Sequence, residues 1–365
     1  MRRPSTSPEP TASDPTRHGS DDIASGAGVS YWADIGGPVH YADFGGPPRA
    51  PLIVCVHGLA GSAANWSALA PLLTRQYRLL APDLAGHGLT RSARRGTDVQ
   101  SNRQLLHRFI EHVSAAPVIL MGNSMGGMIA VLEASAAADR VAGLILVDPA
   151  LPFVPARPDL LVATMFVAGG LPGLGPALLR GVQLLSPEAI VTSTLSLCCH
   201  DPSRVPADAV ARHIALARHR AHFPEAAHDM GIATRSVIAT AGPGGHSYRA
   251  SIATLRCPVL LLHGERDRLV PVSAARAAAQ SHPSWSLIVL PEVGHVPQLE
   301  APRACADAIL GWLDGPGRAA AQKASPAPPA LSAPSLIRRL LPARRSRAGA
   351  RRRRSSDRGL PGNSS

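Results

Sequence analysis

MGNSMGG, residues 121–127, places a serine hydroxyl between glycines at the point where an apolar run ends and an alanine-rich stretch begins. The hydrophobic pattern predicts a buried strand over 117–121 and a helix over 125–137. In this context Gly122-Asn123-Ser124-Met125-Gly126 is a G-x-S-x-G sequence, which sets the serine on a sharp turn from strand to helix. Side chains two positions to either side would collide with the neighbouring elements, so glycine is required there. Ser124 is therefore predicted to project alone from the end of the strand.

Strand-like and helical segments alternate along the chain. Several of the strand-like segments are continuous apolar runs, as expected of strands that are covered on both faces. The expected strands cover residues 38–44, 52–56, 77–81, 117–121, 142–147, 258–262 and 286–290, and the expected helices cover 100–113, 125–137, 272–281 and 301–313. This order predicts an α/β fold with a doubly wound, mostly parallel sheet. In such a sheet ligands bind at the carboxyl ends of the strands.

One block interrupts this alternation. From Ala150 to Gly245 the sequence has helical segments and Pro and Gly breaks but no convincing strand, which predicts a helical insertion, or cap, over the sheet. Residues 160–179 form a run of twenty residues without a charge, long enough to raise a transmembrane interpretation. The two prolines and four glycines of this run favour a pair of short apolar helices instead.

Two further segments place an acid and an imidazole at the same edge of the sheet. LLLHGERDRLVP puts Asp267 just past the strand that ends near Leu262. LIVLPEVGHVPQLEAP puts His295 just past the strand that ends near Leu290. A serine hydroxyl needs a nearby base, and an imidazole needs an anion on its far nitrogen to hold the tautomer and stabilise the imidazolium. Ser124, Asp267 and His295 supply these three roles.

Five motifs in order resemble those of the α/β-hydrolase superfamily over residues from about 36 to 314: VHGLAG (56–61), PDLAGHGLT (82–90), GNSMGG (122–127), HGERDRLVP (263–271) and GHVPQLE (294–300). The resemblance implies an α/β-hydrolase fold with a helical cap that shapes the substrate pocket. It also implies that Ser124 is the nucleophile, His295 the general base and Asp267 the residue that orients this base. The amides of Leu59 and Met125 would form the oxyanion hole.

Two other acidic residues could orient His295 in place of Asp267. Asp148 also follows a strand, in LVDP, and some relatives in the superfamily carry the acid there. Glu265 lies nearer, but two residues before Asp267 it should face away. Asp267 is preferred because it matches the Gly-x-x-Asp pattern of the superfamily, counted from Gly264.

Neighbouring polar and aromatic residues have structural interpretations. We expect His57 to hold the loop that carries the Leu59 amide, and Asp83 and His87 to fix a turn. Trp66 is expected in a helix or a pocket wall.

We expect neither a metal nor a cofactor. The vicinal pair Cys198-Cys199 and the irregularly spaced histidines after it match no zinc template. HGLAGSAANW, which follows the strand at 52–56, has neither the G-x-G-x-x-G pattern nor a Walker lysine, so no nucleotide is implied.

The formal net charge of +12 belongs mainly to the C-terminal end. From Pro316 to Ser365 the chain holds twelve Lys or Arg residues and one acid, so the preceding residues are nearly neutral. We expect a disordered leader over 1–35, an α/β core over 36–149 and 246–314, the cap over 150–245, and a disordered Pro/Ala linker with a basic tail over 315–365.

The ends of the chain bear on location and partners. The twin arginine near the start is not followed by an apolar segment, so we expect no secretory or Tat signal and a cytoplasmic protein. The basic tail has two interpretations: a solvated end, or contact with an anionic membrane surface that would make the protein peripheral. No specific nucleic-acid partner is expected.

The identity of residue 124 as serine limits which reactions of the superfamily are expected. Epoxide hydrolases and haloalkane dehalogenases of the superfamily use an aspartate at this turn, so Ser124 argues against both. Acyl transfer to water remains: a carboxylesterase or lipase-like cleavage of an ester or thioester through an acyl-enzyme. The charge-poor cap favours a small substrate with an apolar acyl group.

Two alternatives to ester hydrolysis stay open. Asn123 and the doubled glycine after Met125 are also common among serine hydrolases that cleave carbon–carbon bonds in ring-fission products. A hypothesis of another class is a ligand-binding or receptor protein on a hydrolase scaffold.

Overall fold

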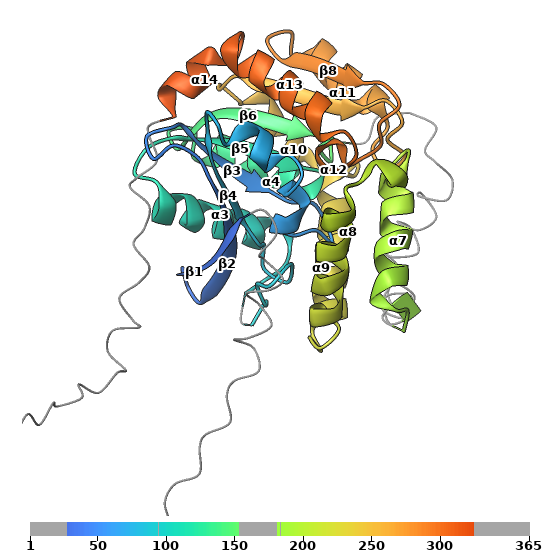
Figure 1. Ribbon diagram of the computed structural model, residues 1–365. Coiled ribbons are helices and arrows are strands. Elements are labelled where there is room, and N and C mark those ends of the chain that lie inside the picture. The colour runs from blue at the N-terminus through green and yellow to red at the C-terminus, as the bar shows by residue number, and fades with distance from the viewer. Residues whose placement is uncertain (1–27, 94, 153–180, 183, 325–365) are drawn as a thin grey trace, which may run out of the picture. The chain divides into compact units, whose positions relative to one another are not determined.

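An eight-stranded sheet forms the framework of the protein (Figure 1). The structure is a computed structural model and describes residues 28–93, 95–152, 181–182 and 184–324. The strands lie in the order β1-β2-β4-β3-β5-β6-β7-β8. Their bounds are β1 Val29–Asp34, β2 Pro38–Gly45, β3 Leu52–Val56, β4 Arg78–Pro82, β5 Val118–Asn123, β6 Val141–Val147, β7 Val259–Gly264 and β8 Ser286–Leu290.

The direction of the strands matches the prediction. β1 pairs antiparallel with β2 and β2 with β4, whereas the pairs from β4 through β3, β5, β6 and β7 to β8 are all parallel. Every strand expected from the hydrophobic pattern is present, with bounds that differ by at most two residues. The predicted doubly wound, mostly parallel α/β sheet is therefore confirmed.

Helices cover both faces of this sheet. Residues of α3, α4, α10 and α11 join one apolar cluster, and residues of α2, α13 and α14 join a second cluster on the other face. The bounds are η1 Ala63–Trp66, α2 Ala70–Leu73, α3 Val99–Val113, α4 Met125–Ala136, α10 His246–Ala253, α11 Val272–Ser281, α12 Pro297–Glu300, α13 Pro302–Asp314 and α14 Arg318–Lys323.

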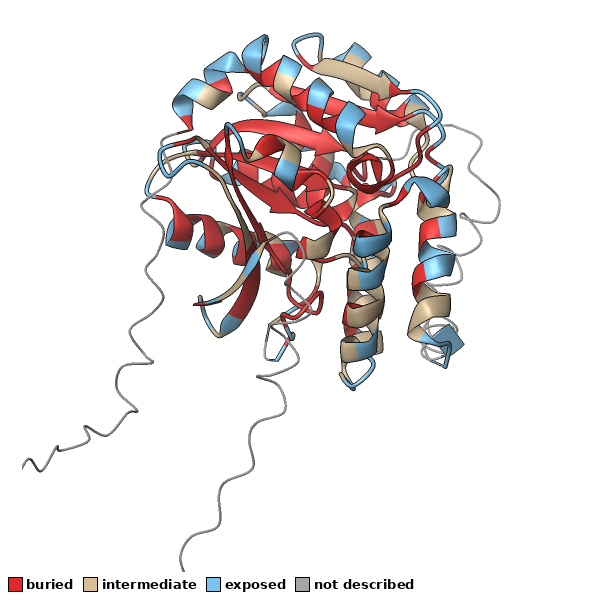
Figure 2. Cartoon of the chain, viewed as in Figure 1, coloured by how far each residue is buried: buried red, intermediate tan, exposed pale blue. Residues whose placement is uncertain are grey.

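Strand β3 illustrates why the central strands are apolar throughout. Leu52, Val54 and Val56 belong to the first cluster, and Ile53 and Cys55 belong to the second. All five side chains are fully buried, as the continuous red of the central strands in Figure 2 shows. Because successive side chains of a strand point to opposite faces, a strand covered on both sides has no polar face.

One expected disordered segment contains a strand. β1 lies inside residues 1–35, so the predicted disordered leader was wrong for its last residues, and residues 1–27 lie outside the described part of the chain. Tyr31 of β1 stacks on Tyr41 of β2 with ring centroids 5.5 Å apart, and Ala33 is buried. The short run is stabilised by pairing with β2, which its own periodicity does not reveal.

The predicted C-terminal linker also starts too early. Helix α14 lies within residues 315–365 and packs on the sheet, with Ala320 fully buried against Gly143 of β6. A Cβ atom at Gly143 would come within 2.5 Å of the Ala320 Cβ, so the glycine makes room for the helix. The prediction missed this contact because small alanines give a weak apolar signal. Residues 325–365, which carry most of the predicted basic tail, lie outside the described residues.

The described part of residues 150–245 is helical, as predicted, and we call this segment the insertion. Its helices are α7 Pro187–Cys198, η2 Pro202–Arg204, α8 Ala207–Arg220 and α9 Ala226–Ala241. The uncharged run at 160–179 lies outside the described residues. Among the residues that the structure describes, no helix is both long and apolar enough to cross a membrane.

The turn between β5 and α4 is the most constrained part of the framework. Ser124 has φ 54° and ψ −119°, a backbone conformation that non-glycine residues rarely adopt. A Cβ atom at Gly126 would lie 2.1 Å from the Val56 carbonyl oxygen and 2.6 Å from that of His57. A Cβ atom at Gly122 would lie 2.5 Å from the Gly126 carbonyl oxygen. The glycines therefore let α4 begin directly against β3, as the sequence pattern predicts.

We predict that Gly126→Ala lowers the free energy of unfolding by at least about 3 kcal/mol, because its methyl group must displace backbone atoms. Gly311→Ala is the matched control: Gly311 lies exposed in α13, and a Cβ atom there meets nothing within 4 Å. The control should raise stability by roughly 0.5–1 kcal/mol. Urea unfolding of both variants checks this, and a Gly126→Ala protein as stable as the wild type would contradict the account.

Candidate active site

The predicted site residues gather at the carboxyl edge of the sheet. Ser124 follows β5, Asp267 lies three residues after β7, and His295 lies five residues after β8. These strands are parallel, so their carboxyl ends meet at one edge. Ser124 is half-buried, whereas Asp267 and His295 are buried.

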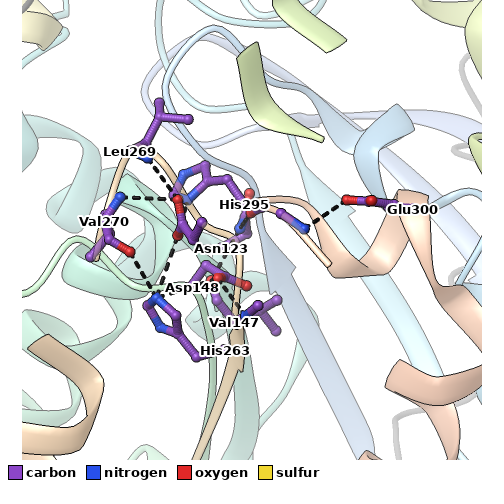
Figure 3. A network of polar contacts seen from close by, with 11 residues as sticks. Asn123, Val147, Asp148, His263, Leu269, Val270, His295 and Glu300 are labelled. Carbon is purple, nitrogen blue, oxygen red and sulfur yellow. Dashed lines mark hydrogen bonds and ion pairs between the residues drawn. The ribbon is translucent and has the colours of Figure 1, made fainter. Parts of the chain in front are cut away.

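Asp267 and His295 form a hydrogen-bonded pair. Figure 3 labels His295 of this pair. The Nδ1 atom of His295 lies 2.7 Å from Oδ2 of Asp267. The other carboxylate oxygen of Asp267 accepts the backbone N–H groups of Leu269 at 2.8 Å and Val270 at 3.0 Å. The carboxylate is thus fixed on both oxygens, and Nε2 of His295 is the ring nitrogen that this pair does not use. Glu265, the nearer rival, is exposed, as predicted.

The electrostatics of Asp267 favour its ionised form. Burial raises the pKa of this carboxyl group, but His295, His263 and the Val270 amide lower it by more, so its pKa lies below the usual value. A carboxylate that stays ionised can stabilise an imidazolium on His295.

Asn123 joins the Ser124 turn to the loop that carries His295. Its side-chain Nδ2 donates to the carbonyl oxygen of Val147 at 3.0 Å and to that of His295 at 3.1 Å. Asn123 is buried, and Figure 3 labels it together with His295 and Val147. Sequence reasoning treated Asn123 as an indicator of substrate type and missed this contact, because the partner lies 172 positions away.

The two amides proposed for the oxyanion hole lie on either side of Ser124 along the fold. Met125 is the first residue of α4, where backbone N–H groups have no partner within the helix. Leu59 is half-buried and follows Gly58, where a Cβ atom would come within 3.1 Å of the Ser124 Cβ. The loop that carries Leu59 therefore passes directly beside the serine.

His57 has the structural role expected from the sequence. Its Nδ1 donates to the Gly58 carbonyl oxygen at 2.8 Å, and its Nε2 accepts the Leu84 N–H at 3.0 Å. Burial is the main cause that lowers the pKa of this imidazole, and the neutral form is the one that can donate with one nitrogen and accept with the other. His57 thus holds the loop that carries Leu59.

Asp83 and His87 also fix a turn, as predicted. One oxygen of Asp83 accepts the Ala63 N–H at 2.7 Å, and the other accepts the Leu89 N–H and the Nδ1–H of His40, both at 2.7 Å. His87 donates from Nδ1 to a backbone carbonyl within the turn, and burial lowers its pKa to about 3.

Asp148, the alternative acid, lies behind Asp267 and is not bonded to His295. Its Oδ1 accepts the Gly264 N–H at 2.9 Å, and its Oδ2 is buried without a partner among the described residues. Burial, and then the nearby charge of Asp267, raise the pKa of Asp148 well above its usual value. The structure therefore holds two buried carboxyl groups with opposite pKa shifts, and the ionised one faces His295.

Asp148, Asp267 and His263 each offer a ligand-type atom, and these atoms lie within 4.8 Å of one another. The Nε2 of His263 donates to the Val270 carbonyl oxygen at 2.9 Å, so this nitrogen carries a proton and is no metal ligand in that state. Burial lowers the pKa of His263. The oxygens of Asp267 already accept two amides and an imidazole. This use of the donor atoms fits hydrogen bonding and does not fit a metal centre.

We predict that Asp148→Asn keeps the activity of the wild type near pH 7 within about threefold, because burial favours the uncharged form of this carboxyl group and asparagine still accepts the Gly264 N–H. The variant should also change how stability depends on pH. In the unfolded chain Asp148 ionises above about pH 4, but in the folded protein its pKa is raised, so its contribution to stability falls as pH increases above that point.

Urea unfolding between roughly pH 4.5 and 7.5 measures this effect. The free energy of unfolding of Asp148→Asn, minus that of the wild type, should grow as pH rises. Asp267 has the opposite dependence, with stability lost as pH falls through its lowered pKa, but it is present in both proteins and largely cancels. A difference that stays constant with pH would mean that Asp148 is already ionised in the folded protein.

Comparison with known proteins places this chain in a family. The family model of the alpha/beta hydrolase fold matches residues 51–302. A dihydrolipoyllysine-residue acetyltransferase component of an acetoin cleaving system from Pseudomonas putida is 30% identical, over 77% of this chain and 68% of its own. A pimeloyl-[acyl-carrier protein] methyl ester esterase from Aromatoleum aromaticum is 28% identical, over 73% and 99%.

Another relative and a solved structure extend the comparison. The 2-hydroxy-6-oxo-6-(2'-aminophenyl)hexa-2,4-dienoic acid hydrolase of Metapseudomonas resinovorans is 27% identical, over 72% of this chain and 83% of its own. The structure of an esterase from Thermogutta terrifontis superposes with a TM-score of 0.57 at 23% identity, over 79% of this chain and 99% of its own. Because the family model spans more than half of the sequence, this protein belongs to the α/β-hydrolase fold family.

Proposed function

We propose that the protein is a serine hydrolase that cleaves a carboxylic ester, or a thioester, of an apolar acyl group through an acyl-enzyme on Ser124. The observation that carries this proposal is the buried Asp267–His295 pair, tied through Asn123 to the strained turn that bears Ser124. A hydroxyl, an imidazole and an ionised carboxylate in this arrangement are the groups that acyl transfer needs.

The reaction starts with proton transfer from the Ser124 hydroxyl to Nε2 of His295 as Oγ attacks the acyl carbon. The amides of Leu59 and Met125 stabilise the negative charge on the carbonyl oxygen. The tetrahedral intermediate then breaks the bond to the alcohol or thiol, which takes the proton from the imidazolium. Asp267 stabilises the imidazolium in this step.

Water completes the cycle. His295 removes a proton from water as its oxygen attacks the acyl carbon of the acyl-enzyme. The second tetrahedral intermediate releases Ser124, which regains a proton from the imidazolium, and the carboxylic acid leaves. The same two amides stabilise the charge in both halves of the reaction.

Several observations support an acyl ester as the substrate. The relative from Aromatoleum aromaticum is named a methyl ester esterase, and the structural neighbour from Thermogutta terrifontis is named an esterase. The insertion contains the uncharged run at 160–179, which favours an apolar acyl chain over a dicarboxylate. We propose that the insertion acts as the cap that bounds the substrate pocket.

A second candidate is cleavage of a carbon–carbon bond. The relative from Metapseudomonas resinovorans, named a hydrolase of a hexadienoic acid, favours this candidate. The carboxamide of Asn123 does not favour carbon–carbon cleavage, because its Nδ2 donates to the backbone carbonyl oxygens of Val147 and His295.

Ser124→Ala should lower kcat for p-nitrophenyl esters by at least about 10³-fold, because the nucleophile is lost. Ser281→Ala, at the exposed end of α11, is the matched control and should keep wild-type activity. A series of acyl chains from short to long measures which length the pocket prefers. Hydrolysis of no ester by the wild type, with turnover of ring-fission dienones, would favour the second candidate.

Asp267→Asn should lower kcat by roughly 10⁴-fold, because asparagine cannot stabilise the imidazolium of His295. Glu265→Gln, two residues earlier and exposed, should leave kcat unchanged. Steady-state kinetics on the best ester of the series provides the measurement. If the Asp267→Asn variant kept activity within about tenfold, Asp148 would become the acid to test.

A further inference from the structure

Glu300 is a buried carboxylate to which neither the proposed mechanism nor the sequence analysis assigns a role. It ends α12 and the segment GHVPQLE, and its side chain is 0% exposed. Its Oε2 accepts the backbone N–H groups of Gly294 at 2.8 Å and His200 at 3.1 Å, and its Oε1 accepts that of Asp201 at 2.8 Å. Figure 3 shows Glu300 beside the loop that carries His295.

These three amides belong to two different segments. Gly294 is the residue before His295, whereas His200 and Asp201 follow α7 in the insertion. The carboxylate therefore bridges the loop of the general base and the insertion. Hydrogen bonds from backbone amides to a buried carboxylate are stronger than those between neutral groups. The Arg204 guanidinium, also in the insertion, lies 3.9 Å from Oε1 of Glu300.

The two segments also touch each other directly. The His295 N–H donates to the Cys198 carbonyl oxygen at 2.6 Å. A Cβ atom at Gly294 would lie 2.4 Å from that same oxygen and 2.6 Å from the His200 nitrogen. The backbone of the general base thus rests against the end of α7, and Glu300 holds the two chains together from the side.

We propose that Glu300 is a positioning residue: its carboxylate fastens the His295 loop to residues 198–201 of the insertion, so that the two move as one unit. Glu300 does not touch the reacting atoms, because its oxygens accept backbone amides. The position of His295 depends on the docking of this part of the insertion, and any opening of the insertion for substrate must occur away from residues 198–201. The activity part of this proposal rests on the proposed function, whereas the structural part does not.

Exposed ion pairs at the same junction provide a control. Glu292 contacts His200 at 2.9 Å and Arg266 at 2.7 Å, and its side chain is about half exposed. Pairs of this kind contribute little to stability in water. Glu292→Gln therefore removes a charge from the junction without removing a bridge between backbone amides.

The first test uses the wild-type protein and needs no substrate. Hydrogen exchange followed by NMR should give the amides of Gly294, His295, His200 and Asp201 one common opening free energy. Different opening free energies for the His295 loop and for the insertion would overturn the proposal. This measurement decides the structural part even if the wild type hydrolyses no ester.

The second test is Glu300→Gln in the full chain. Glutamine keeps one acceptor oxygen but turns an NH₂ group toward amides that donate. We expect kcat for the ester to fall about 10- to 100-fold, the effect of a displacement of His295 by about 1 Å, while KM changes by less than about threefold. The amides of both segments should exchange faster together, and Glu292→Gln should match the wild type in every readout.

Three outcomes of the second test would overturn the proposal. Glu300→Gln with wild-type kcat would show that the bridge does not position His295. A raised KM at unchanged kcat would indicate a role in substrate binding instead. Faster exchange in one segment alone would mean that the two are not joined by Glu300. Should the variant fail to fold, the exchange measurement on the wild type still decides between one unit and two.

Discussion

The contact between the start of α4 and the end of β3 is the constraint on which the site depends. Gly126 lies so close to the Val56 and His57 carbonyl oxygens that a methyl group would not fit, and this packing holds Ser124 in its strained conformation. The strain is maintained because the surrounding strands and helices are buried on both faces of the sheet. One close approach therefore sets three things together: the exposure of the hydroxyl, the start of the helix at Met125 and the proximity of the Leu59 loop.

Two buried carboxyl groups at this edge of the sheet have pKa values shifted in opposite directions. Asp148 and Asp267 are both buried, but Asp267 accepts two amides and the His295 imidazole, whereas Asp148 accepts one amide. Two adjacent buried carboxylates would repel each other in a medium of low dielectric constant, so ionisation of one favours the neutral form of the other. The hydrogen bonds favour ionisation of Asp267, the carboxyl group that faces His295.

The insertion contributes to the site through backbone contacts as well as through the pocket it is proposed to cover. The amide of His295 donates to the last residue of α7, and the carboxylate of Glu300 accepts amides just after that helix. The two hydrogen bonds of the Asn123 side chain connect the His295 loop to β6 and to the Ser124 turn. His295 is thus held from three directions: by Asp267 on its ring, by Asn123 on its carbonyl and by the insertion on its amide.

The sequence by itself determined the parallel sheet, the turn at Ser124 and the order of Ser124, Asp267 and His295, because hydrophobic period and glycine spacing are local signals of strand, turn and helix. It did not reveal β1 or α14, whose stability comes from pairing with β2 and from packing on β6. Nor did it reveal the contacts of Asn123 and Glu300, or which of two buried aspartates is ionised. The bonds of Asn123 to His295, of Glu300 to His200 and of Asp148 to Gly264 join positions one hundred or more residues apart, and only the tertiary structure decides which groups meet there.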